Sequence, residues 1–260
     1  MIKDRTDIPA LDKRVPGVPA IEPVLFPKLD ALYARRSSRL EELAFELVKE
    51  AIQNEASSAP ADEVNAGYFG FLATLVAAQG RILAHSPLSL TETAPIRALL
   101  REGNTSPEIP SQEMLENTQY WQKAFAALVA DAGDHLPAET QDGLQALAAA
   151  PPQVLAAQAY ALLSGQYDQV NAGAAVFLWA ALSVFWAQAI ALLAQDDATL
   201  HQRRSEGGAC PCCGAPPSGS LVLTGDREGL RYLQCSLWET RWHKVRATCS
   251  VCDETGHIDY

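Results

Sequence analysis

The first 209 residues of this 260-residue chain contain no cysteine, and all six cysteines lie in the last 51 residues. That absence excludes a disulfide framework or a thiolate metal site from most of the chain. It predicts a self-sufficient core, for which a 48% hydrophobic content is ample, followed by a small module that depends on its cysteines. The opening residues also lack the apolar run and cleavage site of a secretory signal. We therefore expect a cytoplasmic protein, in which close cysteine pairs bind metal more often than they form disulfides.

Positive charge is also scarce, because 20 Lys and Arg residues face 31 Asp and Glu residues and leave a net charge of −11. This balance argues against nonspecific binding to nucleic acid or anionic lipid, since both require a cationic face. Five basic residues nevertheless lie among the cysteines, at Arg227, Arg231, Arg241, Lys244 and Arg246. They suggest a nucleic-acid-binding zinc ribbon, but the neutral charge of residues 201–260 makes this the weakest hypothesis, and we expect no nucleic-acid partner.

Motifs of catalysis are missing. The sequence has no phosphate-binding GxxxxGK[ST] loop, no GxGxxG after a strand, no GxSxG elbow and no HExxH helix. The histidines of the first 201 residues, His85, His135 and His201, stand near helix ends, in a turn and in a linker, where solvated surface residues are expected. We therefore predict that the chain is not an enzyme.

Strand-like alternation of apolar and polar residues is absent before residue 200, and three regions are predicted. Residues 1–27, with five prolines, form an irregular arm on the surface. Residues 28–200 form an all-helical domain of six to eight helices, and residues 207–260 form a cysteine-bearing β module. The predicted fold class is thus mainly α, with an all-helical domain followed by a small ribbon.

Within the helical region, apolar spacing by threes and fours predicts an amphipathic helix of about 25 residues starting at Leu29. A break at Ser57 to Pro60 precedes a second helix, for which Asp62 is the expected N-cap. Further helices are expected around residues 95–102 and from 111 to about 130. Pro151 and Pro152 must end one helix and can begin the next.

Charge is missing altogether from residues 170–195, a stretch long enough to span a bilayer. Nine of its residues are alanine, Asn171, Ser183 and Gln188 interrupt it, and no other segment looks like a span. A helix that is apolar on all sides is also what the centre of a large helical domain requires. We therefore predict a buried central helix and no membrane span.

The cysteine module begins with Cys210-Pro-Cys-Cys213-Gly, a metal knuckle in which a glycine lets the backbone turn so that two thiolates face one ion. Two alternating segments follow, SLVLT and LRYLQC, joined by a five-residue loop from Gly225 to Gly229. This pattern predicts a β-hairpin that returns Cys235 to the first knuckle. Cys212, inside the knuckle, is expected to be a small filler residue.

A tetrahedral iron or zinc site needs four ligands, but the position three residues after Cys235 is Trp238, which cannot bind metal. His243 can supply an imidazole nitrogen instead. Alternatively, Cys249 and Cys252 form a second intact CxxC pair and can complete a four-thiolate site with Cys210 and Cys213. An open three-thiolate site is a further alternative, although we expect a loss of affinity in so small a module.

The segment CPCCGAPPSGSLVLTGDREGLRYLQCSLWETRWHKVRATCSVC resembles the C-terminal half of the formate dehydrogenase accessory protein FdhE family. The family pattern is a CPxCG knuckle, a strand pair, a CxLCxxxWH knuckle and a further CxxC. The segments LFPKLDALYARRSSRLEELA, YFGFLATLVAAQGRIL and FLWAALSVFWAQAIA are similar to its helices. Two departures stand out: Trp238 replaces a family cysteine, and the family continues to a fourth CxxC pair whereas this chain ends at Tyr260.

The resemblance implies a helical domain joined to a rubredoxin-like module in a cytoplasmic, chaperone-like assembly factor. Such a factor is expected to bind the catalytic subunit of formate dehydrogenase and to hold iron through its knuckles. By position, five cysteines match the family's ligands: Cys210, Cys213, Cys235, Cys249 and Cys252. A rubredoxin-like electron carrier that uses the same thiolates is the alternative function. The sequence singles out no partner-binding residues and no oligomeric state.

Overall fold

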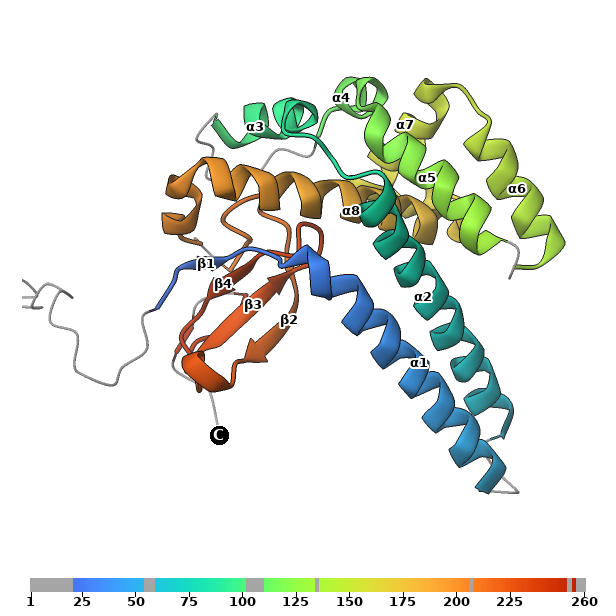
Figure 1. Ribbon diagram of the computed structural model, residues 1–260, viewed down its shortest axis with the longest axis horizontal. Coiled ribbons are helices and arrows are strands. Elements are labelled where there is room, and N and C mark those ends of the chain that lie inside the picture. Colours follow the sequence, from blue (N-terminus) through green and yellow to red (C-terminus); the bar gives the residue numbers. More distant parts are fainter. Residues whose placement is uncertain are drawn as a thin grey trace, which may run out of the picture.

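The protein is described by a computed structural model, which places residues 21–53, 59–101, 110–133, 136–205, 208–251 and 254–255. Within these ranges, helices form most of residues 29–200, and an antiparallel sheet with three of its four strands in the cysteine-bearing end completes the fold, so the predicted mainly α class is confirmed (Figure 1). The helices are α1 Leu29–Gln53, α2 Ala59–His85, α3 Ala94–Arg101, α4 Gln112–Asn117, α5 Gln119–Ala132, α6 Ala138–Ala148, α7 Pro152–Leu163 and α8 Ala172–Asp196. The strands are β1 Val24–Leu25, β2 Pro217–Val222, β3 Arg231–Cys235 and β4 Arg241–His243.

Helices α1 and α2 lie antiparallel and form a long hairpin, whose far end projects from the rest of the molecule (Figure 1). The bounds of α1 are those that the apolar spacing predicts. Tyr33 buries its ring between α1 and α2, where Gly80 leaves space for it. Another side of α1 exposes Phe45 (71%), Val48 and Ile52 (72%), so the hairpin carries a row of large apolar side chains in contact with solvent.

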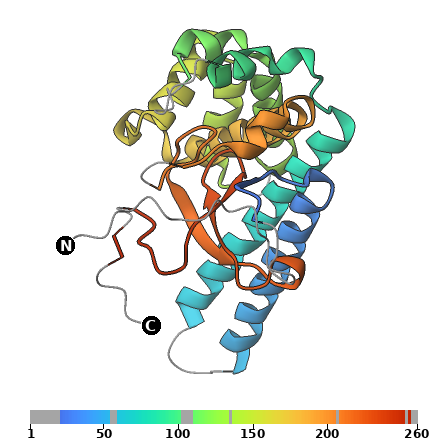
Figure 2. The same cartoon turned by 90° about the vertical axis from the view of Figure 1, so that its left-hand side faces the viewer.

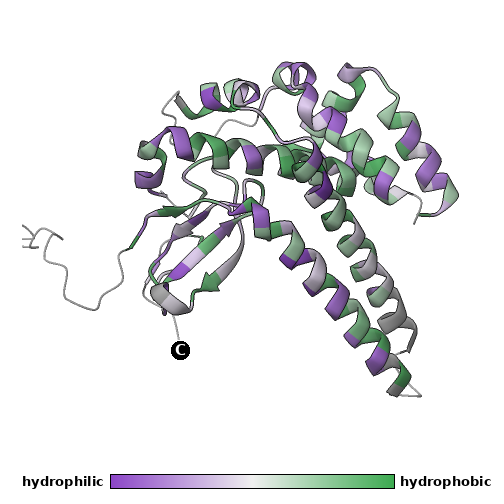
Figure 3. Cartoon of the chain, in the orientation of Figure 1, coloured by the Kyte–Doolittle hydropathy of each residue, from purple (hydrophilic) through white to green (hydrophobic). Residues whose placement is uncertain are grey.

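Helix α8 is the central element of the helical region, as predicted. It is hydrophobic over most of its length, whereas hydrophilic and hydrophobic residues alternate along α1 (Figure 3). Asn171 caps α8 by accepting a hydrogen bond from the amide of Ala174 at 3.1 Å. The polar Gln188 is satisfied inside the core, because it accepts from the amide of Leu88 and its Nε2 donates to the Tyr120 hydroxyl at 2.6 Å.

Two helices are long and apolar enough to cross a membrane, or up to three spans if the bent pair α6 and α7 counts as one. The prediction that no other segment looks like a span is therefore wrong, because Asn65–His85 also meets the criteria of length and composition. The second is Ala172–Asp196 in α8. In its most apolar stretch of 18 residues, 78% is buried inside the fold, whereas 28% of the corresponding stretch of Asn65–His85 is buried. The apolar surface of α8 is therefore used by the protein's own core.

Two predicted helix boundaries are wrong. The single helix expected from residue 111 to about 130 is divided into α4 and α5 at Thr118, whose ψ of 90° is extended. The Thr118 hydroxyl donates to the carbonyl of Met114 at 2.7 Å, a local bond that competes with continuation of the helix. In addition, α2 already begins at Ala59, so Asp62 lies within the helix and not at its N-cap, because Pro60 fits the first helical turn.

The sheet has the strand order β1-β4-β3-β2 and is antiparallel throughout. Strands β2 and β3 form the predicted hairpin. Strand β1, however, comes from the segment that the sequence predicted to be irregular: Val24 lies opposite Trp242, and the amide of His243 donates to the carbonyl of Pro23. A buried Val24 side chain compensates for the prolines on either side. Figure 2 shows the β1 segment beside the strands of the C-terminal module.

Candidate metal centre

The first knuckle lies between α8 and β2. The amide of Cys210 donates to the carbonyl of Ala215 at 3.0 Å, and the amide of Gly214 donates to the carbonyl of Cys210 at 2.7 Å. Gly214 has a φ of 59°, in the left-handed region that glycine adopts without steric cost. The turn therefore has the tight backbone that the CxxCG spacing predicts.

The second knuckle repeats this backbone although its sequence differs. The amide of Cys235, at the end of β3, donates to the carbonyl of Thr240 at 2.8 Å, again across five residues. Glu239, four residues after Cys235, has a φ of 60° and occupies the place of Gly214. The amides of Leu237 and Trp238 donate to Cys235 Sγ at 3.4 and 3.2 Å. Trp238 therefore stands where a metal knuckle has its second cysteine.

Three thiols from the two knuckles lie together. The Sγ atoms of Cys210, Cys213 and Cys235 are all within 4.8 Å of one another, and those of Cys213 and Cys235 are 3.5 Å apart. Cys210 and Cys235 are buried, whereas Cys213 is half-buried. The Thr240 hydroxyl lies 3.1 Å from Cys210 Sγ. Sulfurs at such distances from one another can bind one ion with metal–sulfur bonds of about 2.3 Å.

The ionisation of these thiols is strongly coupled. Burial disfavours the Cys210 thiolate, but hydrogen bonds from the neighbouring thiols and from Thr240 outweigh that cost and lower the pKa of Cys210 well below its usual range. Burial raises the pKa of Cys213, and the hydrogen bond to Cys210 raises the pKa of Cys235 to about 12. One thiolate thus suppresses ionisation of the other two, and a bound cation would remove that repulsion.

Two other predicted ligands, His243 and Cys249, are not part of this group of three thiols. His243, on β4, packs its ring edge-on against Tyr232 at 5.6 Å between centroids, and burial lowers its pKa. The amide of Cys249 donates to the carbonyl of Glu254 at 2.9 Å, and the Cys249 sulfur accepts from the amide of Val251. Cys252 lies outside the described residues.

Sequence reasoning missed residues that support the knuckles. Cys212 is buried, and a hydrogen bond to Cys210 raises its pKa well above the usual range, so it contacts the cluster more closely than a filler residue would. Thr240 is fully buried beside Cys210. The shared five-residue spacing from Cys210 to Ala215 and from Cys235 to Thr240 is the signal that could have identified Thr240.

Glu239 connects the second knuckle to α1. Its carboxylate accepts two hydrogen bonds from the Arg36 guanidinium, at 2.6 and 2.5 Å, and a third from Gln234 Nε2 at 2.8 Å. Arg241 in turn donates to Gln234 Oε1. The Glu239 side chain is 8% exposed and that of Arg36 is 39% exposed. An ion pair thus fixes the turn next to Trp238 against the helical region.

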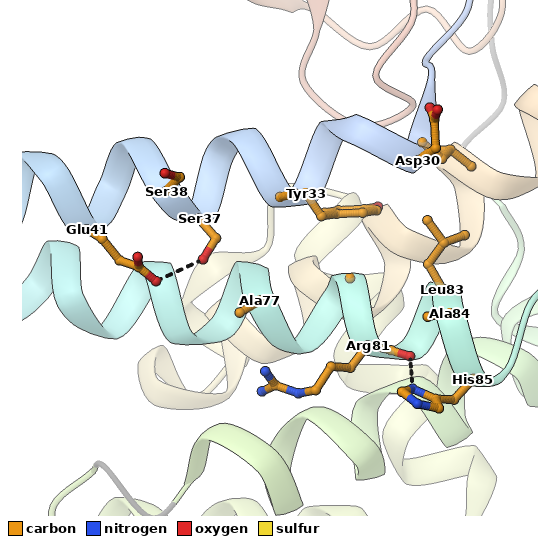
Figure 4. Close-up of a pocket in the computed structure, with 13 residues that line it drawn as sticks. Asp30, Tyr33, Ser37, Ser38, Glu41, Ala77, Arg81, Leu83, Ala84 and His85 are labelled. Atoms are coloured by element: carbon orange, nitrogen blue, oxygen red, sulfur yellow. Dashed lines mark hydrogen bonds between the residues drawn. The ribbon is translucent and has the colours of Figure 1, made fainter.

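A groove of about 730 Å³ lies between α1 and α2 (Figure 4). Several of its polar groups already bond to the helices: the Ser37 hydroxyl shares its proton between Glu41 and the carbonyl of Ala73, and His85 bonds to the carbonyl of Arg81. The Ser37 hydroxyl is buried, and its bond to the Ala73 carbonyl joins α1 to α2, so we assign the Ser37–Glu41 pair a structural role.

Comparison with known proteins matches both parts of the chain. A family model described as "FdhE, N-terminal" matches residues 59–202, and one described as "FdhE, central domain" matches residues 209–246. A "Protein FdhE homolog" from Cronobacter sakazakii is 35% identical over 253 residues, which cover 96% of this chain and 73% of the relative. "Protein FdhE" from Shigella boydii is 35% identical over 241 residues, or 92% of this chain and 71% of the relative.

A solved structure shares the fold. The crystal structure of the FdhE protein from Pseudomonas aeruginosa superposes with a TM-score of 0.65 and 30% sequence identity, covering 91% of this chain and 74% of the other.

Proposed function

The chain belongs to the FdhE family, and from this membership we propose that it is a non-enzymatic accessory protein that binds the catalytic subunit of formate dehydrogenase during its assembly. The observation that carries the proposal is that family similarity extends over both the helices and the knuckles, residues 59–202 and 209–246. Most of the helical region and the first two knuckles are therefore both of the family type.

The side-chain chemistry supports a role without catalysis. His85 bonds to the carbonyl of Arg81, and His201 bonds to the carbonyl of Ala194 and packs its ring against Phe26. Neither imidazole faces a nucleophile in the part of the chain that the structure describes. The thiols of the knuckles face one another, an arrangement suited to holding an ion. We propose that the protein acts in the cytoplasm, where these thiols stay reduced.

We propose that Cys210, Cys213 and Cys235 hold one iron or zinc ion. Three sulfurs within 4.8 Å of one another, two knuckle backbones and the hydrogen bonds to Cys235 support this assignment. When bound, zinc would supply folding energy and iron would add one-electron chemistry. Cys249, Cys252 and His243 remain predicted contributors.

Electron transfer is the second candidate function. Amide-to-sulfur hydrogen bonds such as those from Leu237 and Trp238 to Cys235 tune the reduction potential of thiolate-bound iron. An anaerobically purified protein with a reversible one-electron couple would favour this role. A colourless, zinc-only protein without such a couple would exclude it.

The client surface is proposed to lie on the α1–α2 hairpin. Phe45, Val48 and Ile52 form an apolar row on its exposed side, and the hairpin projects from the molecule (Figure 1). Apolar side chains grouped on a surface are typical of interaction sites. An accessory protein needs such a surface for its client, here the formate dehydrogenase catalytic subunit.

The test is co-purification in a host that makes formate dehydrogenase and lacks its own copy of this protein. We expect the affinity-tagged chain to retain the catalytic subunit, identified by mass spectrometry, and to restore formate-dependent dye reduction. A tagged chain that folds but neither retains the subunit nor restores activity would contradict the proposal.

A further inference from the structure

We infer that the centre of this chain binds its ion through three thiolates, Cys210, Cys213 and Cys235, and leaves one coordination position for a thiolate from outside the chain. The inference rests on the metal-binding part of the proposed function and not on the identity of the client. Two complete knuckles would supply four cysteines, and this chain differs from that pattern at Trp238.

The first step is that Trp238 occupies a true ligand position. Both knuckles have a hydrogen bond from residue i to residue i+5 and a left-handed residue at i+4, with φ values of 59° and 60°. Trp238 is residue i+3 of the second knuckle, as Cys213 is of the first. Because the backbone is kept, the substitution removes one ligand without displacing Cys235 from the other two thiols.

The second step is that no other described side chain joins the three thiols as an ionisable ligand. The group that satisfies the mutual distance of 4.8 Å contains Cys210, Cys213 and Cys235, and neither His243 nor Cys249 is part of it. Thr240 lies close, but its neutral hydroxyl is a hydrogen-bond partner for Cys210. Sites that keep three protein ligands leave the fourth position of a tetrahedral ion open to exchange.

The third step concerns access and the class of ligand. Cys210 and Cys235 are buried and Trp238 is 3% exposed, whereas Cys213 is half-buried, so an outside ligand approaches past Cys213. An ion selected by three soft sulfur donors favours a fourth donor of the same kind. The ligand is therefore a monodentate thiolate, supplied either by a small free thiol or by a cysteine of another protein.

The test uses Co²⁺ as a spectroscopic probe in the full-length chain, reduced with a phosphine and kept anaerobic. We expect the parent and Trp238→Cys to bind one Co²⁺ each, the parent with the weaker charge-transfer bands of a three-thiolate site. Adding 2-mercaptoethanol should intensify the parent's bands towards those of Trp238→Cys and leave the variant unchanged. A second arm with an unstructured peptide that carries one cysteine distinguishes the two thiol sources, since only a protein-accessible site responds to it.

Several outcomes would overturn the inference. A parent spectrum that already has four-thiolate intensity and ignores both thiols would mean that the chain completes its own site. A decrease on Cys249→Ser or on Cys252→Ser in the parent would identify that residue as the fourth ligand, and this arm does not depend on the folding of Trp238→Cys. Binding by Trp238→Cys alone would show that three thiolates are insufficient. Binding by neither protein would instead refute the metal-binding part of the proposed function.

Discussion

At the scale of the residue, Thr240 and Glu239 determine how the second knuckle behaves. Thr240 places its hydroxyl 3.1 Å from Cys210 Sγ, and Glu239 takes the left-handed position that glycine holds in the first knuckle. Neither residue offers a ligand in the cluster. Both residues act by orienting the cysteine ligands, which is the usual role of partners in the outer shell of a metal site.

Removing the Thr240 hydroxyl should weaken metal binding. Thr240→Val keeps the side-chain volume but removes the hydrogen bond to the Cys210 sulfur, so we expect about a tenfold loss of Zn²⁺ affinity. Competition with a chromophoric chelator measures the change. Thr224→Val, in the exposed hairpin loop of the same module, is the matched control and should bind as the parent does. Equal affinity in both variants would show that the hydroxyl has no part in the site.

The ion pair between Arg36 and Glu239 should stabilise the fold measurably. A double-mutant cycle with Arg36→Met and Glu239→Gln isolates its coupling energy. We expect about 1–2 kcal/mol, above that of an exposed pair because Glu239 is buried, and moderated because Arg36 is partly exposed. Urea unfolding of the four proteins gives the value. The exposed pair Arg39 and Glu42 serves as the control, with a coupling near zero.

At the scale of the element, the α1–α2 hairpin combines a packed face with an unpaired one. Its inner face buries Tyr33 against α2, while Phe45, Val48 and Ile52 lie along the outer face of α1. Because the outer side chains contribute little to packing, changing them separates recognition from stability.

Replacing the outer apolar row should therefore abolish client capture without unfolding the protein. For Phe45→Ser combined with Ile52→Ser we expect unfolding free energy within about 0.5 kcal/mol of the parent. Retention of the formate dehydrogenase catalytic subunit in the co-purification should fall at least several-fold. Val222→Ser, an exposed apolar residue on β2, is the control. Undiminished retention by the double variant would place the client surface elsewhere.

The elements that sequence reasoning predicts well are those with a long, regular pattern. The bounds of α1 follow from its apolar spacing, and the central position of α8 follows from a run without charge. The break at Thr118 and the strand β1 were missed because each depends on one local or distant hydrogen bond that spacing does not reveal. For the site, cysteine spacing predicted the meeting of Cys210, Cys213 and Cys235, whereas the ion pair of Glu239 with Arg36 depends on tertiary packing.

At the scale of the whole molecule, the sheet and the helices share one core. Trp238 and Trp242 of the module belong to the same buried cluster as Tyr33 of α1 and Phe185 of α8. Strand β1 and the ion pair at Glu239 add two further connections. We therefore expect a change at the metal centre to alter the local stability of α1.

Removing the metal should loosen a defined part of the molecule. After chelation of the loaded protein, we expect faster amide hydrogen exchange in residues 210–243 and in the Arg36 region of α1, because these parts are held through the second knuckle. Helices α5 to α7 should keep their protection. Hydrogen exchange read by mass spectrometry measures this. Uniform loosening throughout the chain would indicate that the metal stabilises a single cooperative unit.

The pairing of β1 with β4 also determines when the sheet can form during synthesis. Glu22, whose carbonyl accepts from the Tyr232 hydroxyl, precedes that residue by 210 positions. At about 5–20 residues per second a ribosome needs roughly 10–40 s to add that length. During this time β1 has no strand to pair with, because β4 has not yet been synthesised, while the helices between the two strands can already assemble. The sheet therefore forms after the helices between its strands, and the capture of an ion, which requires Cys235 on β3, can only follow the synthesis of that residue.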